Sequence, residues 1–336
     1  IRTYLIGERV RPQKRVRACK TNNQDFMDWF DKYGQSKATE NTRRHYAYVW
    51  RLLLSYCKDR SMSTIYFQDI DYRMLKDLRA WVLDGREDVT RYKVESYMHA
   101  AYKEAQRMKM VSRDNDPYDD FRIDKATRTK EDIDTISLKD LRRLLSLDLR
   151  EQQGVEGLSK ARDILWASFC LCGVNLCDIY ILPKTDEDEI VYIRQKNRNR
   201  RNVRSTHAAI TMDVEAIIER YAGKDHLFKF QEDTPNYYTF QRRLNNRCER
   251  LSKLNGAQVN MQLIRRTWAT IAGEVGVDWH TVDKSLGHMD ESVTDIHYQQ
   301  FNWQKAAKQN QKVIDYVLKG VVPNSVKVPK LFRKSA

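Results

Sequence analysis

The strongest constraint on the fold is a set of apolar stripes at helical spacing in the first third of the chain. Between positions 22 and 111, apolar residues recur every three or four positions, which is the spacing of one face of an α-helix. The stripes are Tyr46, Trp50, Leu53, Leu54 and Cys57; then Met74, Leu75, Leu78, Trp81 and Val82; then Val94, Tyr97, Met98, Ala101, Ala105 and Met108. Asp71 precedes the second stripe, where its carboxylate can cap the helix. We therefore predict a small all-helical domain whose aromatic residues form its core rather than platforms for stacked bases.

The rest of the chain alternates helical patterns with one pair of strands. Ser137 begins a leucine-rich helix, and Asp140 follows three residues later in a capping-box arrangement. Residues 190–193 and 203–211 read as the two strands of a hairpin. Further helical patterns cover 161–182 (a long apolar helix and its exit), 214–221, 237–254, 261–274 and 304–318, the last of which stops at Gly320. The chain is therefore expected to be mainly α (α+β).

Shifts in composition divide the chain into five segments. We predict a basic arm at 1–20, a helical domain at 21–112, a linker at 113–135, a second domain at 136–320 and a tail at 321–336. The linker is charged, contains Pro117 and shows no periodicity, which is typical of a connection between domains. The arm is interrupted by Pro12, and it either follows a phosphate backbone or is a solvated tail.

The charge of the chain favours a polyanionic partner. Lys and Arg number 60 against 46 Asp and Glu, which gives a net charge of +14. Nucleic acid and an anionic membrane surface are the candidates. No apolar stretch is long enough to span a bilayer, and no secretory signal pattern begins the chain. We therefore expect a nucleic-acid partner, no membrane, and a place in the cytoplasm.

The cysteines indicate a reducing compartment rather than a disulfide framework. They are Cys19, Cys57, Cys170, Cys172, Cys177 and Cys248, and their spacing fits no such framework. Cys170, Cys172 and Cys177 are either a metal cluster or buried thiols. Their spacing is not that of a zinc site and they lie in an apolar run, which favours buried thiols. No metal is expected.

Three groups of polar residues stand in a fixed order near the C-terminal end. The chain reads Arg265-Arg266-Thr267-Trp268-Ala269-Thr270, then Ser285-Leu286-Gly287-His288, then Asp295-Ile296-His297-Tyr298. A guanidinium, an imidazole and a phenol together can attack a phosphodiester without a metal. This order resembles the catalytic end of the tyrosine recombinases, the phage-integrase family, which reads Arg-His-Thr-x-Ala-Thr, then Leu-Gly-His, then a tyrosine. The resemblance is strongest toward integrases of Bacteroides-type mobile elements, through Val293-Thr294-Asp295-Ile296 and Lys312-Val313-Ile314-Asp315-Tyr316.

The resemblance implies a fold and an activity for nearly the whole chain. The first domain resembles the helical core-binding, SAM-like domain of the family, and the second resembles its catalytic domain. Such a pair forms a C-shaped clamp on double-stranded DNA. The implied activity is site-specific recombination through a 3′-phosphotyrosine and a Holliday junction, with no cofactor. The implied assembly is a homo-tetramer on paired DNA sites, built from protomers that are monomers in solution and associated with the bacterial nucleoid. Integration, excision and inversion all stay open.

The resemblance also assigns roles to individual residues. Tyr298 is the nucleophile, Arg265 holds two phosphate oxygens, and His288 donates to a non-bridging oxygen. Lys196, just after the first predicted strand, is either the general acid or one member of a phosphate-binding hairpin. Gln262, where the family often has His, is either a neutral phosphate donor or a structural residue.

The position of the nucleophile departs from the family pattern. Tyr298 follows His288 by 298 − 288 = 10 residues, one more than is usual in the family. Tyr298 keeps the family spacing to Phe301 and to the run at 313–315, so the additional residue falls between His288 and Tyr298. His297 is the alternative nucleophile, because histidine can form a phosphoramidate, and it is the less favoured one.

The largest departure lies upstream, in Gly173-Val174-Asn175-Leu176-Cys177-Asp178. Asn175 occupies the position of the family's first catalytic arginine, and Asp178 that of an acidic residue. Asparagine cannot make a charge-assisted bidentate contact, and losing one such contact costs roughly 3 kcal/mol, about a hundredfold in rate. The candidate replacements are Arg266, Arg198, Arg200 and Arg162. A catalytically impaired recombinase fold that only binds DNA is therefore the alternative function.

Other basic residues are expected to contact the DNA backbone. They flank the helical stripes, crowd the hairpin turn or follow Arg265: Arg43, Arg44, Arg91, Lys93, Arg198, Arg200, Arg201 and Arg266. Base contacts are not assigned, because they depend on groove geometry.

Overall fold

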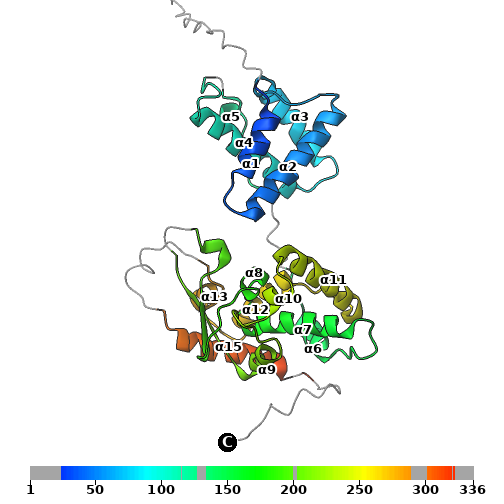
Figure 1. Cartoon of the computed structure of the whole chain (residues 1–336), viewed down its shortest axis with the longest axis vertical. Coiled ribbons are helices and arrows are strands. Elements are labelled where there is room, and N and C mark those ends of the chain that lie inside the picture. Colours follow the sequence, from blue (N-terminus) through cyan, green and yellow to red (C-terminus); the bar gives the residue numbers. More distant parts are fainter. Residues whose placement is uncertain are drawn as a thin grey trace, which may run out of the picture. The chain divides into compact units, whose positions relative to one another are not determined.

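The structure is a computed structural model that describes residues 24–114, 116–126, 134–199, 203–288, 301–319 and 321. The chain divides into two units, Ile1–Lys130 (unit 1) and Glu131–Ala336 (unit 2), each with its own hydrophobic core. Helices make up most of both units in Figure 1, and the described residues of unit 2 include a two-stranded antiparallel sheet. The prediction of a mainly helical chain with a small sheet is confirmed. The predicted arm at 1–20 lies outside the described residues.

Unit 1 consists of amphipathic helices around an apolar core. Its elements are α1 (Phe26–Gln35), α2 (Glu40–Asp59), the 3-10 turn η1 (Phe67–Asp69), α3 (Tyr72–Leu83), α4 (Asp88–Arg107) and α5 (Pro117–Asp120). Helix α1 contacts α2 and α4, and α3 contacts α4. Phe26, Phe30 and Leu53 are fully buried in the resulting core. The predicted cap is confirmed, since Asp71 Oδ1 accepts a hydrogen bond from the backbone N–H of Met74 at 2.7 Å.

The predicted apolar stripes of unit 1 are too wide at their edges. Tyr46, Leu53 and Cys57 are buried, but Leu54 is 39% exposed and Met108 is 58% exposed. Successive residues of a helix are rotated by about 100° around its axis. Leu53 and Leu54 therefore cannot both face the same core.

The first part of the predicted linker belongs to unit 1. Pro117 begins α5, and Tyr118 and Phe121 are buried in the core of the unit. Asp116 caps α5 and also accepts a hydrogen bond from Lys103 of α4. Residues 116–126 lack helical periodicity because they form a short capped turn and an extended stretch that pack on α3 and α4. The prediction of a linker is wrong for these residues.

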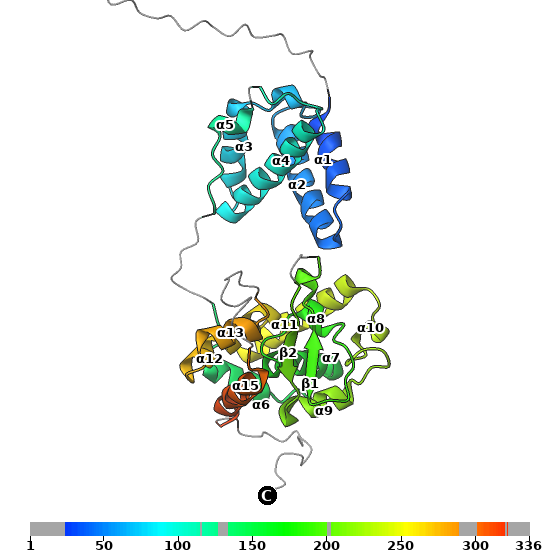
Figure 2. The same cartoon turned by 90° about the vertical axis from the view of Figure 1, so that its left-hand side faces the viewer.

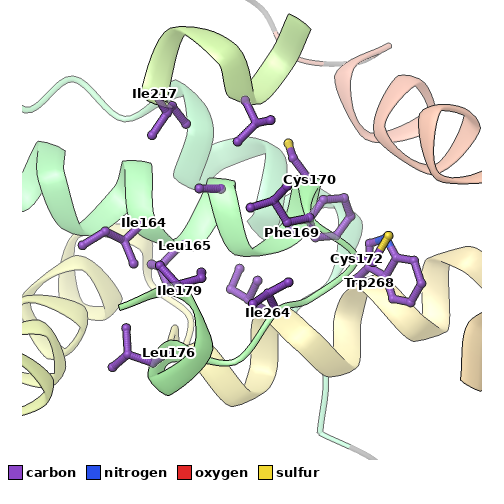
Figure 3. Packing of buried hydrophobic residues seen from close by; sticks show 14 of the residues in the cluster. Ile164, Leu165, Phe169, Cys170, Cys172, Leu176, Ile179, Ile217, Ile264 and Trp268 are labelled. Atoms are coloured by element: carbon purple, nitrogen blue, oxygen red, sulfur yellow. The ribbon is translucent and has the colours of Figure 1, made fainter. Parts of the chain in front are cut away.

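Unit 2 is organised around one apolar helix, α7 (Val155–Cys170). Its other elements are α6 (Leu138–Ser146), α8 (Leu176–Ile179), β1 (Glu189–Tyr192), the 3-10 turn η2 (Gln195–Asn197), β2 (Thr206–Ala209), α9 (Met212–Arg220), α10 (Phe230–Asp233), α11 (Tyr237–Asn255), α12 (Met261–Glu274), α13 (Trp279–Ser285) and α15 (Trp303–Leu318). Helix α7 contacts α6, α9, α11, α12 and α15. Figure 3 shows Ile164, Leu165 and Phe169 of α7 amid the apolar side chains of its neighbours.

Helix α7 ends earlier than the apolar pattern at 161–182 suggests. Cys172 and Gly173 have φ angles of +58° and +70°, in the left-handed region that ends a helix. Ser168 Oγ donates to the carbonyl of Val174 at 2.8 Å and holds this turn together. The short helix α8 then begins after Asn175. The turn between α7 and α8 thus places Gly173 and Asn175 at one end of the central helix.

The two strands form the predicted hairpin but are shorter than predicted. They pair antiparallel from Glu189 opposite Ala209 to Tyr192 opposite Thr206, as Figure 2 shows for β1 and β2. Residues 193 and 203–205 lie outside this ladder. The connection turns into η2, because its polar groups bond to α8 and to the end of α13 rather than to the opposite strand.

Candidate active site

The turn Leu286-Gly287-His288, which follows α13, joins the elements that carry several of the predicted site residues. Gly287 has a φ of +65°, and a Cβ built on it would lie 2.4 Å from Cδ of Arg194 and 2.6 Å from Oγ1 of Thr206. Both the backbone conformation and this close approach of the hairpin require glycine. The carbonyl groups of Leu286 and Gly287 accept hydrogen bonds from side chains of α12 and of the hairpin. The turn therefore joins three elements of unit 2.

Arg265 of α12 is held by two backbone carbonyl groups. Its Nη1 donates to Gly173 at 2.7 Å, and its Nη2 donates to Leu286 at 2.6 Å. A Cβ on Gly173 would lie 3.0 Å from Cγ of Arg265, so this glycine also permits the approach. Burial, and then the neighbouring charge of Arg194, lowers the pKa of Arg265 to about 10. The guanidinium stays charged at neutral pH, and its hydrogen-bond partners are dipoles rather than anions.

His288 is positioned by Asp283 of α13. Its ring Nδ1 lies 2.6 Å from Asp283 Oδ1, and its backbone N–H donates to the carbonyl of Asp283 at 3.1 Å. Asp283 is buried, whereas the side chain of His288 is 47% exposed. The carboxylate accepts a hydrogen bond from Nδ1–H, which leaves Nε2 as the ring nitrogen for a substrate.

The connection between β1 and β2 also forms hydrogen bonds with the turn at 286–288. Arg194 Nη1 donates to the carbonyl of Gly287 at 2.9 Å, and Asn197 Nδ2 donates to the same oxygen at 3.2 Å. The buried carboxylate of Asp178 in α8 accepts from the backbone N–H of Gln195 at 2.7 Å. Burial raises the pKa of Asp178, and the Gln195 N–H and the charge of Arg194 oppose this rise. Helix α8, the hairpin and α13 are thereby fastened together.

Three further predicted catalytic residues lie on the same elements. Lys196 is the exposed middle residue of η2. Gln262 is exposed in the first turn of α12, three residues before Arg265. Asn175 is half-buried before α8, and its side chain makes no capping hydrogen bond. Direct contacts thus join Arg265 to the residues beside His288, while Lys196, Gln262 and Asn175 stand on the adjoining hairpin and helices. Tyr298 and His297 lie outside the described residues.

The prediction that Arg91 contacts DNA has to be corrected. Its side chain is buried in unit 1, where it donates to Asp88 Oδ1 at 2.6 Å and to Glu95 Oε2 at 2.9 Å. It also donates to the carbonyl of Asp124 at 2.9 Å. A guanidinium held by two carboxylates inside a core is not available to a phosphate. Sequence spacing placed Arg91 beside the apolar stripe, but packing turns it inward.

The other predicted DNA contacts have varied surroundings. Arg43 and Arg44 share the carboxylate of Glu40 at 3.0 and 3.1 Å, and all three side chains are at least 40% exposed. The Lys93 ammonium group lies 5.5 Å from the centre of the Tyr48 ring. In unit 2, Arg198 is exposed and Arg266 is half-buried. Arg200 and Arg201 lie outside the described residues.

Sequence reasoning missed three residues that build the site: Arg194, Asn197 and Asp283. Arg194 and Asn197 stand in the basic hairpin, but nothing local distinguishes them from the exposed Lys196 between them. Asp283 precedes His288 by one helical turn and the end of α13, a spacing that carries no established motif. Their roles depend on contacts between elements that are distant along the chain.

The cysteine prediction is confirmed for two of the thiols that it concerns. Cys170 and Cys172 are buried in the core of unit 2, and burial raises the pKa of both. Cys177 is half-buried. Within the described parts of the chain, no group of three or more His, Cys, Asp and Glu side chains is arranged to hold a metal ion. None of the helices described there combines the length and the apolar character that crossing a membrane requires.

Comparisons with known proteins show which domain family unit 1 matches and which fold the chain has. Residues 25–123 match the phage integrase SAM-like domain, which spans unit 1 from α1 through α5. No curated protein matches the sequence. The predicted likeness to Bacteroides-type elements in particular stays a prediction.

Solved structures match over most of the chain. The Tn1549 transposon integrase in complex with circular intermediate DNA is 14% identical, with a TM-score of 0.54 over 85% of this chain and 99% of that one. A lambda integrase dimer bound to a COC′ core site is 11% identical, with a TM-score of 0.58 over 83% and 98%. The XerH site-specific recombinase bound to difH is 14% identical, with a TM-score of 0.51 over 84% and 93%. At these identities the likeness concerns the fold.

Proposed function

Because the chain has the fold of the tyrosine recombinases, we propose that it is a site-specific DNA recombinase that cuts and rejoins DNA through a 3′-phosphotyrosine. In this proposal unit 1 is the core-binding domain and unit 2 is the catalytic domain. The net charge of +14 supports a DNA partner.

One observation carries the proposal. Arg265 donates to the carbonyl of Leu286, two residues before His288, whose Nε2 is left free by the bond from Nδ1 to Asp283. A guanidinium of α12 bonded to this turn and an imidazole on the turn, which donates when Nε2 carries a proton, are the donors that a five-coordinate phosphorus needs as its non-bridging oxygens gain charge. The exposed face of His288 gives a phosphate access to this turn.

The proposed chemistry assigns one task to each group. The phenol oxygen of Tyr298 attacks the phosphorus, and the bond from phosphorus to the 5′-oxygen breaks. Lys196, exposed in η2 on the adjoining hairpin, donates a proton to the leaving 5′-oxygen. The phosphotyrosine retains the energy of the broken bond, so the free 5′-hydroxyl of a partner strand can later displace the tyrosine. Gln262, one turn before Arg265, donates to the phosphate as a neutral group.

Relatives of the same fold support an assembly on DNA. Structures of lambda integrase include a dimer bound to a core site and a tetramer bound to a Holliday junction. We extend this to the present chain as a homo-tetramer on two paired sites, formed from monomers and working on the nucleoid in the bacterial cytoplasm. Integration, excision and inversion of a mobile element all use the same strand exchange.

Covalent trapping tests the proposal. Duplexes that the protein binds are first selected from a randomised pool, and each is then nicked at successive positions so that the 5′-hydroxyl is lost after cleavage. The native protein is expected to form a complex that resists detergent, joined to a 3′ end. Tyr298→Phe is expected to bind the same duplex and to form no such complex.

Two variants make the test specific to Tyr298. Tyr316→Phe removes a phenol on α15 that is 39% exposed, and it should trap DNA as the native protein does. His297→Ala should also trap DNA. If Tyr298→Phe trapped DNA and His297→Ala did not, His297 would be the nucleophile.

The second candidate function is DNA binding without chemistry. Asn175 favours it, because a neutral amide stands where the family has a catalytic arginine. If the native protein binds its selected duplexes tightly and traps none of them at any nick position, this function replaces the first.

A further inference from the structure

The site lacks one positive charge that its proposed chemistry requires. Attack on a phosphodiester adds negative charge to the non-bridging oxygens, and paired cations stabilise it. Arg265 supplies one cation, but Asn175 supplies none. If the chain is a recombinase as proposed, a second cation has to stand close to the turn at 286–288.

Three of the four basic residues that the sequence suggests do not meet this requirement, and the fourth, Arg200, lies outside the described residues. Arg162 donates to the carbonyl of Leu147 at 2.8 Å, after the end of α6, and its charged neighbours include Asp163 and Arg220. Arg266 is rotated by about 100° from Arg265 around α12. Arg198 is exposed to solvent, which screens its charge.

Arg194 stands where the charge is needed. It is only 7% exposed, and its Nη1 donates to the carbonyl of Gly287 at 2.9 Å. Arg265 Nη2 donates to the carbonyl of Leu286 at 2.6 Å. The two guanidinium groups therefore hold consecutive carbonyls of the turn that carries His288. Their mutual repulsion contributes to the lowered pKa of Arg265, second to burial.

The surroundings of Arg194 leave part of its charge uncompensated. Its Nε lies 3.8 Å from Asp178 Oδ2, too far for a hydrogen bond, and this buried nitrogen has no hydrogen-bond partner. Asp178 uses its other oxygen to bind the backbone of Gln195. A buried donor without a partner calls for an explanation, because it lowers stability without a compensating contact.

We infer that Arg194 supplies the positive charge that Asn175 lacks. The charge reaches the site from the hairpin instead of from α8, and it stands behind the turn rather than in contact with the phosphate. A phosphate bound by Arg265 and His288 lies beside that turn, where a buried charge is weakly screened. Arg194 is thus a positioning residue: it holds the carbonyl of Gly287 and acts on the phosphate through space.

The decisive variant is Arg194→Gln, which keeps a donor for the carbonyl of Gly287 and removes the charge. Covalent trapping on a selected, nicked duplex should slow by about a hundredfold, which is more than the affinity for that duplex falls. Adding Asn175→Arg to this variant should recover at least about tenfold, because the charge returns from α8. Arg142→Gln is the control, since Arg142 also donates to two carbonyls, those of Tyr316 and Val317, on α15. It should trap DNA at the native rate.

A neutral phosphate separates the charge of Arg194 from a merely structural role. On a duplex with a methylphosphonate at the scissile position, the native protein and Arg194→Gln should react at equal rates, because the charge to be stabilised is gone. Native-like trapping by Arg194→Gln on ordinary DNA would overturn the inference. So would a defect that is equally large on both duplexes and is not relieved by Asn175→Arg.

Binding decides the inference even if the proposed function fails. Should the native protein trap no DNA, duplexes with one methylphosphonate at each position in turn are compared for affinity. The native protein should bind one of them more weakly than the unmodified duplex, and Arg194→Gln should lose most of that difference. An unchanged difference in Arg194→Gln would overturn the inference independently of any cleavage.

Discussion

Two internal arginines, Arg91 in unit 1 and Arg265 in unit 2, have opposite surroundings. Arg91 donates to the carboxylates of Asp88 and Glu95 at 2.6 and 2.9 Å, and these bonds raise its pKa. Arg265 donates to two backbone carbonyls at 2.7 and 2.6 Å, and burial lowers its pKa to about 10. One cation is hydrogen-bonded to carboxylates, whereas the other is hydrogen-bonded only to carbonyl groups and has the carboxylate of Asp178 as a charged neighbour.

This difference is what separates a structural arginine from the proposed phosphate-binding arginine. Glu95 is also bound by Arg79 at 2.6 Å, so the ion-pair network of unit 1 is complete without a ligand. The turn of unit 2 holds two guanidinium groups, those of Arg265 and Arg194, through its carbonyls, with one nearby carboxylate, that of Asp178. Such an arrangement has a net cost in the free protein that the phosphate of the proposed reaction would reduce. Exposure alone does not reveal this, since neither side chain is freely solvated.

The largest effect is expected from Arg91→Met. Removing one partner from a buried ion pair leaves Glu95 partly uncompensated, so the free energy of unfolding of unit 1 should fall by about 3–5 kcal/mol. Denaturant titration followed by tryptophan fluorescence measures this change. Arg43→Met is the matched control, because Arg43 pairs with Glu40 at the surface and its removal should cost less than about 1 kcal/mol. If Arg91→Met stayed stable but bound DNA weakly, Arg91 would be a DNA contact after all.

Arg265→Gln should affect the reaction rather than the fold. Loss of one fixed cation at the transition state is expected to slow covalent trapping by about 10²–10³-fold, equivalent to about 3–4 kcal/mol. Removal of a largely buried charge offsets the lost hydrogen bonds, so the stability of unit 2 should change by less than about 2 kcal/mol. The measurements are the trapping rate and the thermal unfolding of the same samples. If Arg265→Gln strongly lowered the stability of unit 2 but hardly slowed trapping, Arg265 would be a structural arginine like Arg91.

Asp283→Asn should have a smaller effect on the same reaction. The side-chain amide replaces the charge-assisted hydrogen bond at Nδ1 of His288 with a weaker neutral one, so it holds the imidazole less firmly in place for the phosphate. Trapping is expected to slow by about 10–100-fold, or about 1.4–2.7 kcal/mol. Nitrogen NMR of the imidazole reports the change in the hydrogen bond at Nδ1. Asp278→Asn, on the same helix, keeps its cap on Thr281 and should react normally. A native rate in Asp283→Asn would remove Asp283 from the site.

The smallest expected effect is a dependence of the stability of unit 1 on pH. Burial favours a higher pKa for Asp116, but hydrogen bonds from Lys103, the Tyr118 backbone and Gln106 outweigh it, so the pKa falls below its usual 3.8. The folded state binds this proton less tightly than the unfolded state. The resulting stability is present above the unfolded pKa and is lost as the pH falls through the folded one. Asp116→Asn should therefore cost about 1 kcal/mol at pH 6 and less at pH 3. A cost that does not change with pH would mean that the carboxylate is not stabilised by these bonds.

Local patterns predict the helices of this chain well, and contacts between distant segments limit the prediction of the site. Helix α12 begins and ends at the predicted residues, and Ser137 caps α6 as predicted, because both depend on neighbours within a few positions. Arg194 and Gly287 are separated by 93 residues, and their contact exists only when the hairpin packs on α13. Arg43 and Arg91 look alike beside their apolar stripes. Each has a carboxylate one helical turn away, Glu40 for Arg43 and Glu95 for Arg91, but tertiary packing buries only the pair of Arg91 and Glu95.

The turn at 286–288 also restricts how the length of this chain can change during evolution. The carbonyl of Leu286 bonds to Arg265, that of Gly287 bonds to Arg194, and the ring of His288 bonds to Asp283. Inserting or deleting one residue just before the turn would break this register, whereas a change after His288 leaves these partners in place. The additional residue between His288 and Tyr298 lies after the turn, where a change in length leaves these contacts in place. Insertions and deletions are therefore expected to accumulate downstream of the turn, where they change the distance to the proposed nucleophile and leave these three contacts intact.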